Sequence, residues 1–173
     1  VYAAERARAE ETAEERDEAV GRLLAWYLHT ADAAYPHITP NRRRIPLEPL
    51  PAGCRPLEFT TREDAVEWCE RERANLVGAV HQAAGSGRRP GIAWRLPAVL
   101  WGFFYLRSHS HDWLDTTTTG LAAARAAGDR TGEAQGLADR SAALRDSGRL
   151  EEAITPLRQA MTIFRELGHT EGR

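Results

Sequence analysis

Residues 150–167 read LEEAITPLRQAMTIFREL and set the expectation for the whole chain. Apolar residues recur there in steps of three and four, the spacing that places side chains on one face of an α-helix. Those apolar residues are Leu150, Ala153, Ile154, Leu157, Ala160, Met161, Phe164 and Leu167. Gly168 follows, and glycine commonly ends a helix. We therefore expect a helix with a buried stripe, in which Leu157→Ala costs about 2–5 kcal/mol.

Three further helices are expected before this one, because the same spacing recurs between glycine-containing turns. They span residues 92–108, 112–127 and 131–147. The first of them, IAWRLPAVLWGFFYLRS, is apolar on almost every side, which predicts a central helix covered by its neighbours. Its proline, Pro97, is expected to bend it. Its aromatic residues are assigned to the core rather than to a ligand platform.

A helix over 61–84 begins at one of two overlapping capping boxes, in which a threonine is followed three residues later by an acidic residue. Thr60 pairs with Glu63 in one box, and Thr61 pairs with Asp64 in the other. No stretch of the chain alternates apolar and polar residues as a half-buried strand does. The expected fold class is therefore all-α.

The N-terminal part of the chain is expected to form one long helix over 3–34, of which the first half is charged on nearly all sides. The second half carries an apolar stripe that should dock on the rest of the domain. The stripe consists of Val20, Leu23, Leu24, Tyr27, Leu28 and Ala31. Pro36 is expected to end this helix, because proline lacks the amide hydrogen that a helix needs.

The next segment, residues 35–60, contains six prolines and is not expected to be helical. We expect an extended strap across the helices, with its apolar side chains tucked in. Those side chains are Ile45, Leu47, Leu50, Leu57 and Phe59. The basic run Arg42–Arg44 could contact phosphate, but a solvated run or pairing with the acidic first helix is favoured. The chain thus divides into a helix over 1–34, the strap, and a helical domain over 61–173.

The composition suits one packed domain and excludes several classes of protein. The chain has 173 residues, of which 42% are hydrophobic and 28% are charged, so it can bury a core. Its formal charge of −2 gives no overall attraction to nucleic acid or anionic lipid. Its most apolar stretch, 92–106, is shorter than the roughly 20 residues that a spanning helix needs. Two cysteines make no disulfide framework. A cytoplasmic protein without a membrane partner is expected.

The sequence offers little catalytic or metal-binding chemistry. His109, His111 and Asp112 form the one histidine cluster, and no third metal ligand beside the two histidines is evident. A polar turn, with an N-cap from Ser110 or Asp112, is favoured over a metal site. The chain also has no glycine-rich phosphate loop. We therefore expect no metal, no cofactor, no catalytic residue and no enzyme activity.

Two segments of the chain resemble each other 40 positions apart. LAAARAAGDRTGE at 121–133 matches MTIFRELGHTEGR at 161–173, with their glycines aligned. A period of this length is typical of helical hairpins, which bury their apolar faces only by stacking on a neighbour. The expected hairpins are 92–127 and 131–168. The last hairpin is expected to leave an apolar face uncovered, through which two molecules could associate.

The second hairpin resembles the tetratricopeptide repeat. The resemblance rests on GRLEEA at 148–153, Leu157 and Ala160, and on Ser141 and Leu144 in the preceding helix. Arg140 and Pro156 depart from the family's pattern. The resemblance implies a short right-handed solenoid of stacked antiparallel hairpins, with a groove lined by the first helix of each. At the matched positions, the groove residues that could bind a partner are Arg95, Tyr105, Gln135, Ala138 and Arg145.

A longer series of segments resembles a family of large regulators. The segments are VYAAERA at 1–7, RLLAWYLHTADAA at 22–34, RRIPL at 43–47, ERERANLV at 70–77 and LWGFF at 100–104. In this order they resemble the region after the nucleotide-binding module of actinomycete regulators of the antibiotic-regulatory type. Those regulators are signal-transduction ATPases with numerous domains, and the first segment resembles the end of their winged-helix part.

This resemblance implies a non-enzymatic regulatory segment that links an NTPase core to tetratricopeptide repeats. The repeats would bind a signal or a partner, or hold the NTPase closed, and the first helix would transmit the change. The implied partner is a protein, a peptide or the NTPase core itself, and DNA would be contacted only by domains outside this segment. The alternative is a free-standing tetratricopeptide adaptor with no NTPase attached.

Overall fold

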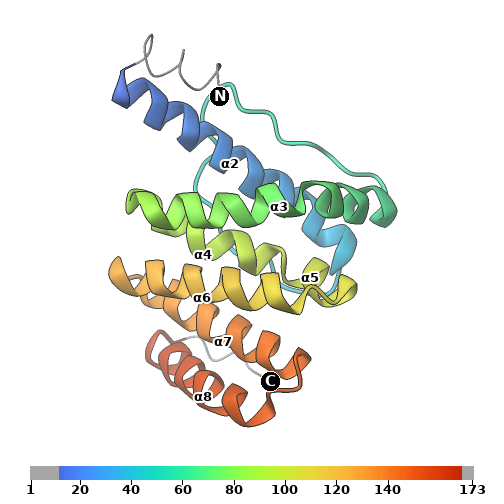
Figure 1. The fold of residues 1–173 in the computed structure, drawn as a ribbon, viewed down its shortest axis with the longest axis vertical. Coiled ribbons are helices and arrows are strands. Elements are labelled where there is room, and N and C mark those ends of the chain that lie inside the picture. Colours follow the sequence, from blue (N-terminus) through green and yellow to red (C-terminus); the bar gives the residue numbers. More distant parts are fainter. Residues whose placement is uncertain (1–11, 169–173) are drawn as a thin grey trace.

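The computed structural model describes residues 12–168, and every regular element in that range is an α-helix (Figure 1). The helices are α2 (Ala13–Ile38), α3 (Arg62–Ser86), α4 (Pro90–Val99), α5 (Trp101–Arg107), α6 (Ser110–Ala126), α7 (Arg130–Asp146) and α8 (Leu150–Glu166). The expected all-α class is confirmed for these residues. The expected helix start at residue 3, the segment 1–7 and the repeat residues 169–173 lie outside them. No helix in the described range is long and apolar enough to cross a membrane.

The first described helix, α2, begins at a capping box that was not predicted. The side chain of Thr12 accepts a hydrogen bond from the amide of Glu15 at 3.1 Å, and the Glu15 carboxylate accepts one from the amide of Thr12 at 2.7 Å. Farther along, Leu24 and Leu28 are buried as expected, but Leu23 is exposed. The expected docking of Leu23 is wrong, because α3 and α4 cover only the opposite part of the helix surface.

The expectation that Pro36 ends this helix is also wrong, since α2 continues to Ile38. Proline removes the amide hydrogen that would bond to the carbonyl four residues earlier, which belongs to Asp32. In the structure, Nη2 of Arg44 lies 3.4 Å from that carbonyl oxygen and donates to it. A side chain from the strap thus replaces the missing backbone donor, and the helix gains one more turn.

The strap is extended as expected, and it joins α2 to α3 without helix or strand over residues 39–61 (Figure 1). Its side chains are less buried than predicted. Leu47 and Phe59 pack against the core, whereas Leu57 is exposed, so the expectation that it is tucked in is wrong. The backbone of Leu57, rather than its side chain, holds the strap here, because its amide donates to Oγ1 of Thr30 at 3.3 Å.

The apolar helix expected over 92–108 is divided into α4 and α5 at Leu100. Hydrogen bonds continue across the division, from the Leu100 amide to Leu96 and from the Phe104 amide to Leu100, so the two parts form one bent helix. Three residues before the division, Pro97 leaves the carbonyl of Ala93 without its helical donor. α6 comes so close to this carbonyl at Gly120 that a side chain would not fit there. A Cβ on Gly120 would lie 2.6 Å from the Ala93 oxygen.

The remaining helices stack in chain order, from α3 through α4, α6 and α7 to α8 (Figure 1). Two three-residue turns with the same hydrogen bonds join α6 to α7 and α7 to α8. In each turn a glycine with positive φ, Gly128 or Gly148, follows the helix end and donates to a carbonyl three residues earlier. The predicted bounds of these three helices are correct to within two residues, because such glycine turns are local signals.

Only part of the apolar stripe of α8 faces the core: Ala153 and Ala160 are buried as expected, and Phe164 packs against the same cluster. The core side of α8 is formed by small or short apolar side chains, which are Ala153, Pro156, Ala160 and Ile163. Leu157 is 42% exposed, and Leu150, Ile154 and Met161 are exposed as well. The expected burial of Leu157 is therefore wrong. Within the described residues α8 packs mainly on α7, because it lies at the end of the stack (Figure 1).

Candidate functional site

The basic run of the strap reaches the far part of the helix stack. Nη2 of Arg42 lies 3.3 Å from Oδ1 of Asp139, which belongs to α7. The guanidinium carbon of Arg42 also lies 4.3 Å from the centroid of the Trp101 ring, close enough for a cation–π contact. One arginine of the strap therefore bridges α5 and α7.

The carboxylate that receives this arginine is buried. Asp139 is only 2% exposed, and its Oδ2 accepts a hydrogen bond from Nε2 of Gln135 at 2.9 Å. Burial raises the pKa of the Asp139 carboxyl to about 6, although Arg42 and the hydrogen bond from Gln135 lower it. A buried charge is costly unless it is paired, so Asp139 favours a cationic group at this position.

Four further contacts fasten the strap to α2 and α4. Arg44 pairs with the carboxylate of Asp32 on α2. Nε of Arg95 donates to the carbonyl of Pro46 at 3.0 Å, and Nε2 of His29 lies 3.1 Å from the carbonyl oxygen of Glu48. Near the other end of the strap, Nε1 of Trp26 donates to the carbonyl of Arg55 at 2.9 Å. The strap is thus held along its length on the helices that precede and follow it.

The structure brings some of the predicted groove residues to this site. Arg95 holds the strap, Gln135 supports Asp139, and Tyr105 stacks on Trp101 with ring centroids 5.6 Å apart. Tyr105 is 58% exposed and is the most open of the three.

Two other predicted groove residues, Ala138 and Arg145, lie elsewhere. Ala138 is half-buried and packs with the small apolar cluster between α7 and α8. Arg145 is exposed near the end of α7. Neither makes a hydrogen bond or ion pair with the strap among the described residues.

The central residues of the site, Arg42, Trp101 and Asp139, were not predicted as a set. Arg42 belonged to a basic run whose partner was left open, and Trp101 was assigned to the core. The available signal was Asp139 itself, an acidic residue within the helix expected over 131–147. One member of the run, Arg44, does pair with the first helix, but with Asp32 rather than with its acidic first half.

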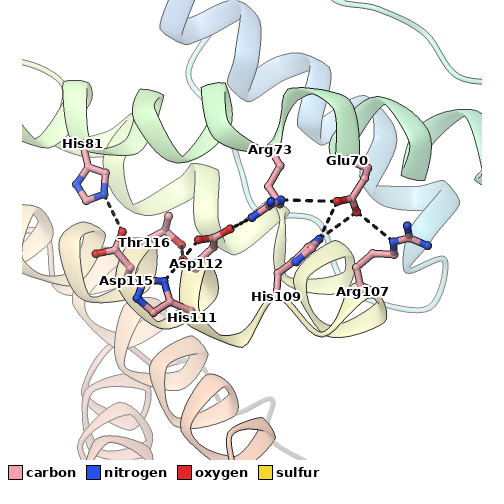
Figure 2. A network of polar contacts seen from close by, with 9 residues as sticks. All are labelled: Glu70, Arg73, His81, Arg107, His109, His111, Asp112, Asp115 and Thr116. Carbon is pink, nitrogen blue, oxygen red and sulfur yellow. Dashed lines mark hydrogen bonds and ion pairs between the residues drawn. The ribbon is translucent and has the colours of Figure 1, made fainter.

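A second polar network joins α3 to α5 and α6 (Figure 2). The carboxylate of Glu70 on α3 accepts a hydrogen bond from Nε of Arg107 at 3.1 Å, and Nε2 of His109 lies 3.0 Å from it. The contact with His109, followed by that with Arg107, lowers the pKa of Glu70 against the opposing effect of burial. Beside it, Arg73 pairs with Asp112. This network connects three helices and has the character of a structural support.

The network does not form a metal site. His109 turns toward Glu70, whereas His111 points away from it and lies beside Asp112 (Figure 2). Among residues 12–168 no group of three or more possible metal ligands comes together. The expected N-cap is wrong, because Ser110 lies inside α6 and donates to the carboxylate of Asp146 at 2.6 Å.

Cys69 does not offer the reactive thiolate that a nucleophile needs. Cys69 is buried in α3, and burial raises the pKa of its thiol to about 12. Cys54 is half-buried in the strap, where its Sγ lies 3.8 Å from the carbonyl oxygen of Arg22. The absence of enzyme activity stays a prediction.

Comparison with known proteins gives one informative likeness. The chain is 33% identical over 153 residues to the regulatory protein AfsR of Streptomyces coelicolor. This chain is similar to one part of AfsR. The aligned part is 86% of this chain but 15% of AfsR, so the likeness covers a small share of that protein. The expected similarity to an actinomycete regulator is confirmed over the aligned 153 residues. No protein-family model matches the chain, no solved structure matches it, and the tetratricopeptide assignment stays a prediction.

Proposed function

We propose that this chain is a non-enzymatic regulatory segment that binds a protein or peptide partner on the helix face crossed by the strap. The observation that carries the proposal is the position of the Arg42 guanidinium, which contacts both the buried Asp139 carboxylate and the Trp101 ring. The arginine comes from a segment without helix or strand, so an extended segment of a partner could replace it. The relationship to AfsR, a regulatory protein, supports the regulatory part of the proposal.

The face in question would be the groove of a short right-handed solenoid of the tetratricopeptide type. We take α4–α5 with α6 as one hairpin and α7 with α8 as the next. The repeated glycine turns support this, as does Ser141, which is buried and donates from Oγ to the carbonyl of Ala153 at 2.9 Å. A small residue at this position lets α7 and α8 approach closely. The proposed partner contacts are Arg95, Tyr105 and Gln135, whereas the two other predicted groove residues, Ala138 and Arg145, lie away from the strap.

The strap would act as a reversible cover of this groove. It is fastened to α2 through Arg44 and Asp32, and to α7 through Arg42 and Asp139. A partner that displaced the strap would therefore also change the contacts of α2. In a multidomain NTPase-type regulator, α2 would pass that change to the NTPase core, and the core itself is one candidate partner. DNA would be contacted only through other domains.

Photocrosslinking at Tyr105 tests this proposal. With a photoreactive residue at this exposed position in the native host, we expect crosslinks to one discrete protein, or to another part of the same regulator. Arg42→Ala should increase their yield, because it removes the strap's arginine from the groove. The matched control carries the photoreactive residue at Gln82, which is exposed on α3. Equal crosslinking at both positions, or no effect of Arg42→Ala, would contradict the proposal.

The alternative is a free-standing adaptor of the tetratricopeptide type that binds a protein or peptide partner by the same face. The two proposals differ in the coding sequence upstream of this segment. A phosphate-loop motif there supports the NTPase-type regulator, whereas its absence supports the adaptor. Association of two copies through the exposed stripe of α8 is compatible with both.

A further inference from the structure

A cavity of about 450 Å³ lies between α2, the strap and the first turns of α4. Its apolar walls are formed by Ala25, Leu28, Pro49, Pro51 and Ile92. Pockets that bind small organic molecules typically measure about 300–1,000 Å³ and combine apolar walls with a few polar groups. The cavity therefore has the size and the lining of a small-molecule site, and Arg95 is the one lining residue that it shares with the proposed partner groove.

The strap wall of this cavity is held in place. Nε of Arg95 donates to the carbonyl of Pro46, and Nε2 of His29 lies beside the carbonyl oxygen of Glu48, so contacts from α4 and α2 fix the same few residues. Gly91 in the first turn of α4 leaves room for the side chains at this wall. A Cβ there would lie 2.6 Å from Nη1 of Arg95 and 2.7 Å from Oε1 of Glu48.

Two arginines that line the cavity differ in their pairing. Arg89 is fully engaged, since its Nη1 and Nη2 donate to the carboxylate of Asp17 at 2.9 and 2.7 Å. Arg95 has a side chain that is only 18% exposed, yet its Nη1 lies 3.7 Å from Oε1 of Glu48, beyond hydrogen-bond distance. Glu48 itself is 73% exposed. Arg95 therefore keeps donor capacity for a second anion, which would interact more strongly than the distant Glu48.

We propose that this cavity binds a small organic molecule with an apolar body and one carboxylate. The carboxylate would accept hydrogen bonds from Arg95, and the body would lie against Leu28 and Ile92. Of the three arginines that line the cavity, Arg89 is neutralised by Asp17 and Arg22 lies near Glu18, so Arg95 is the one left to receive an anion. This inference rests on the proposed regulatory function and deepens it, because such a ligand would contact α2, the strap and α4 together.

Three probes of equal chain length test the proposal on the 173-residue chain by isothermal titration calorimetry. They are octanoate, octan-1-ol and octylammonium. We expect octanoate to bind about tenfold more tightly than octanol, since one charge-assisted hydrogen bond is worth that much, and octylammonium to bind most weakly. Arg95→Met should lower the octanoate affinity about tenfold and leave the octanol affinity unchanged. Arg158→Met, at an exposed position of α8 that does not line the cavity, is the matched control and should change neither.

A second variant keeps the test decisive if Arg95→Met fails to fold. Glu48→Gln lies on the exposed strap and removes the resident anion, so it should raise the octanoate affinity severalfold. The proposal is overturned if none of the probes binds at millimolar concentration, if octanoate binds no better than octanol, or if Glu48→Gln has no effect. Because binding is measured directly, these outcomes are independent of the crosslinking result at Tyr105.

Discussion

Arg42 of the strap contacts the buried carboxylate of Asp139 at 3.3 Å, across 97 positions of sequence. Most ion pairs on protein surfaces add little stability, because both charges stay hydrated. This pair differs, since Asp139 is buried in α7 and its other oxygen is bonded to Gln135. Removal of the arginine would leave a buried charge without its counter-ion, which costs more than the loss of an exposed pair.

The first prediction concerns this pair. We expect Arg42→Ala to lower the free energy of unfolding at pH 7.5 by about 1–3 kcal/mol, measured by urea denaturation. Arg71→Ala, which removes an exposed arginine from α3, is the control and should change stability by less than about 0.5 kcal/mol. If the two variants lose the same free energy, the contact between Arg42 and Asp139 does not stabilise the fold.

The second prediction follows from the raised pKa of Asp139. Its carboxyl has a pKa of about 6 in the fold and an ordinary value of 3.8. Between those values the folded chain binds more protons than the unfolded chain, so this group makes the protein more stable as the pH falls from 6 toward 4. The gain is up to about 3 kcal/mol and is absent above about pH 7, where the carboxyl is charged in both states.

Other carboxyls act in the opposite direction and must be separated from this effect. Contacts with His109 and with Arg89 lower the pKa values of Glu70 and Asp17, so the stability from these groups is lost in acid. The measurement is therefore the difference in unfolding free energy between the wild-type chain and Asp139→Asn, from pH 7 to pH 4. We expect this difference to shift in favour of the wild-type chain as the pH falls. A difference that is constant with pH would mean that Asp139 titrates normally.

The parts of the fold that the sequence predicted depend on local signals. The bounds of α6, α7 and α8 followed from apolar spacing and from Gly128 and Gly148, whose positive φ ends each helix within its own turn. The end of α2 was mispredicted because the local effect of Pro36 is offset by Arg44, a residue of the strap. The exposed stripe of α8 was mispredicted because periodicity identifies an apolar face but not the element that covers it.

For the candidate site, too, the sequence pattern selected only residues that lie in regular helices. Arg95 and Gln135 lie on helices that line the proposed groove, so a repeat pattern was enough to select them. The contact of Arg42 with Trp101 and Asp139 depends on the path of the strap, which contains no periodic pattern. The sequence predicted that this segment is extended, but its path is determined by contacts with residues of α2, α4 and α7 that are distant in the chain.

The third prediction compares two apolar residues of α8 that differ in burial. Ile163 is buried in the cluster between α7 and α8, so Ile163→Ala should lower the free energy of unfolding by about 2–4 kcal/mol. Leu157 is largely exposed, so Leu157→Ala should cost at most about 1 kcal/mol. Urea denaturation of both variants measures the contrast. Equal losses would place Leu157 in a core contact, either within one molecule or between two.

The fourth prediction concerns association through the exposed side of α8. Four apolar side chains, Leu150, Ile154, Leu157 and Met161, lie in water there, and an apolar patch of this kind favours pairing with a second copy. We expect the wild-type chain to form dimers in sedimentation equilibrium at millimolar concentration, and Leu157→Glu to remain monomeric because dimerisation would bury a carboxylate. Thr155→Glu adds the same charge to an exposed polar position of α8 and should still dimerise. A wild-type chain that is strictly monomeric under these conditions would contradict self-association, whereas equal weakening by both variants would indicate charge repulsion rather than an apolar interface.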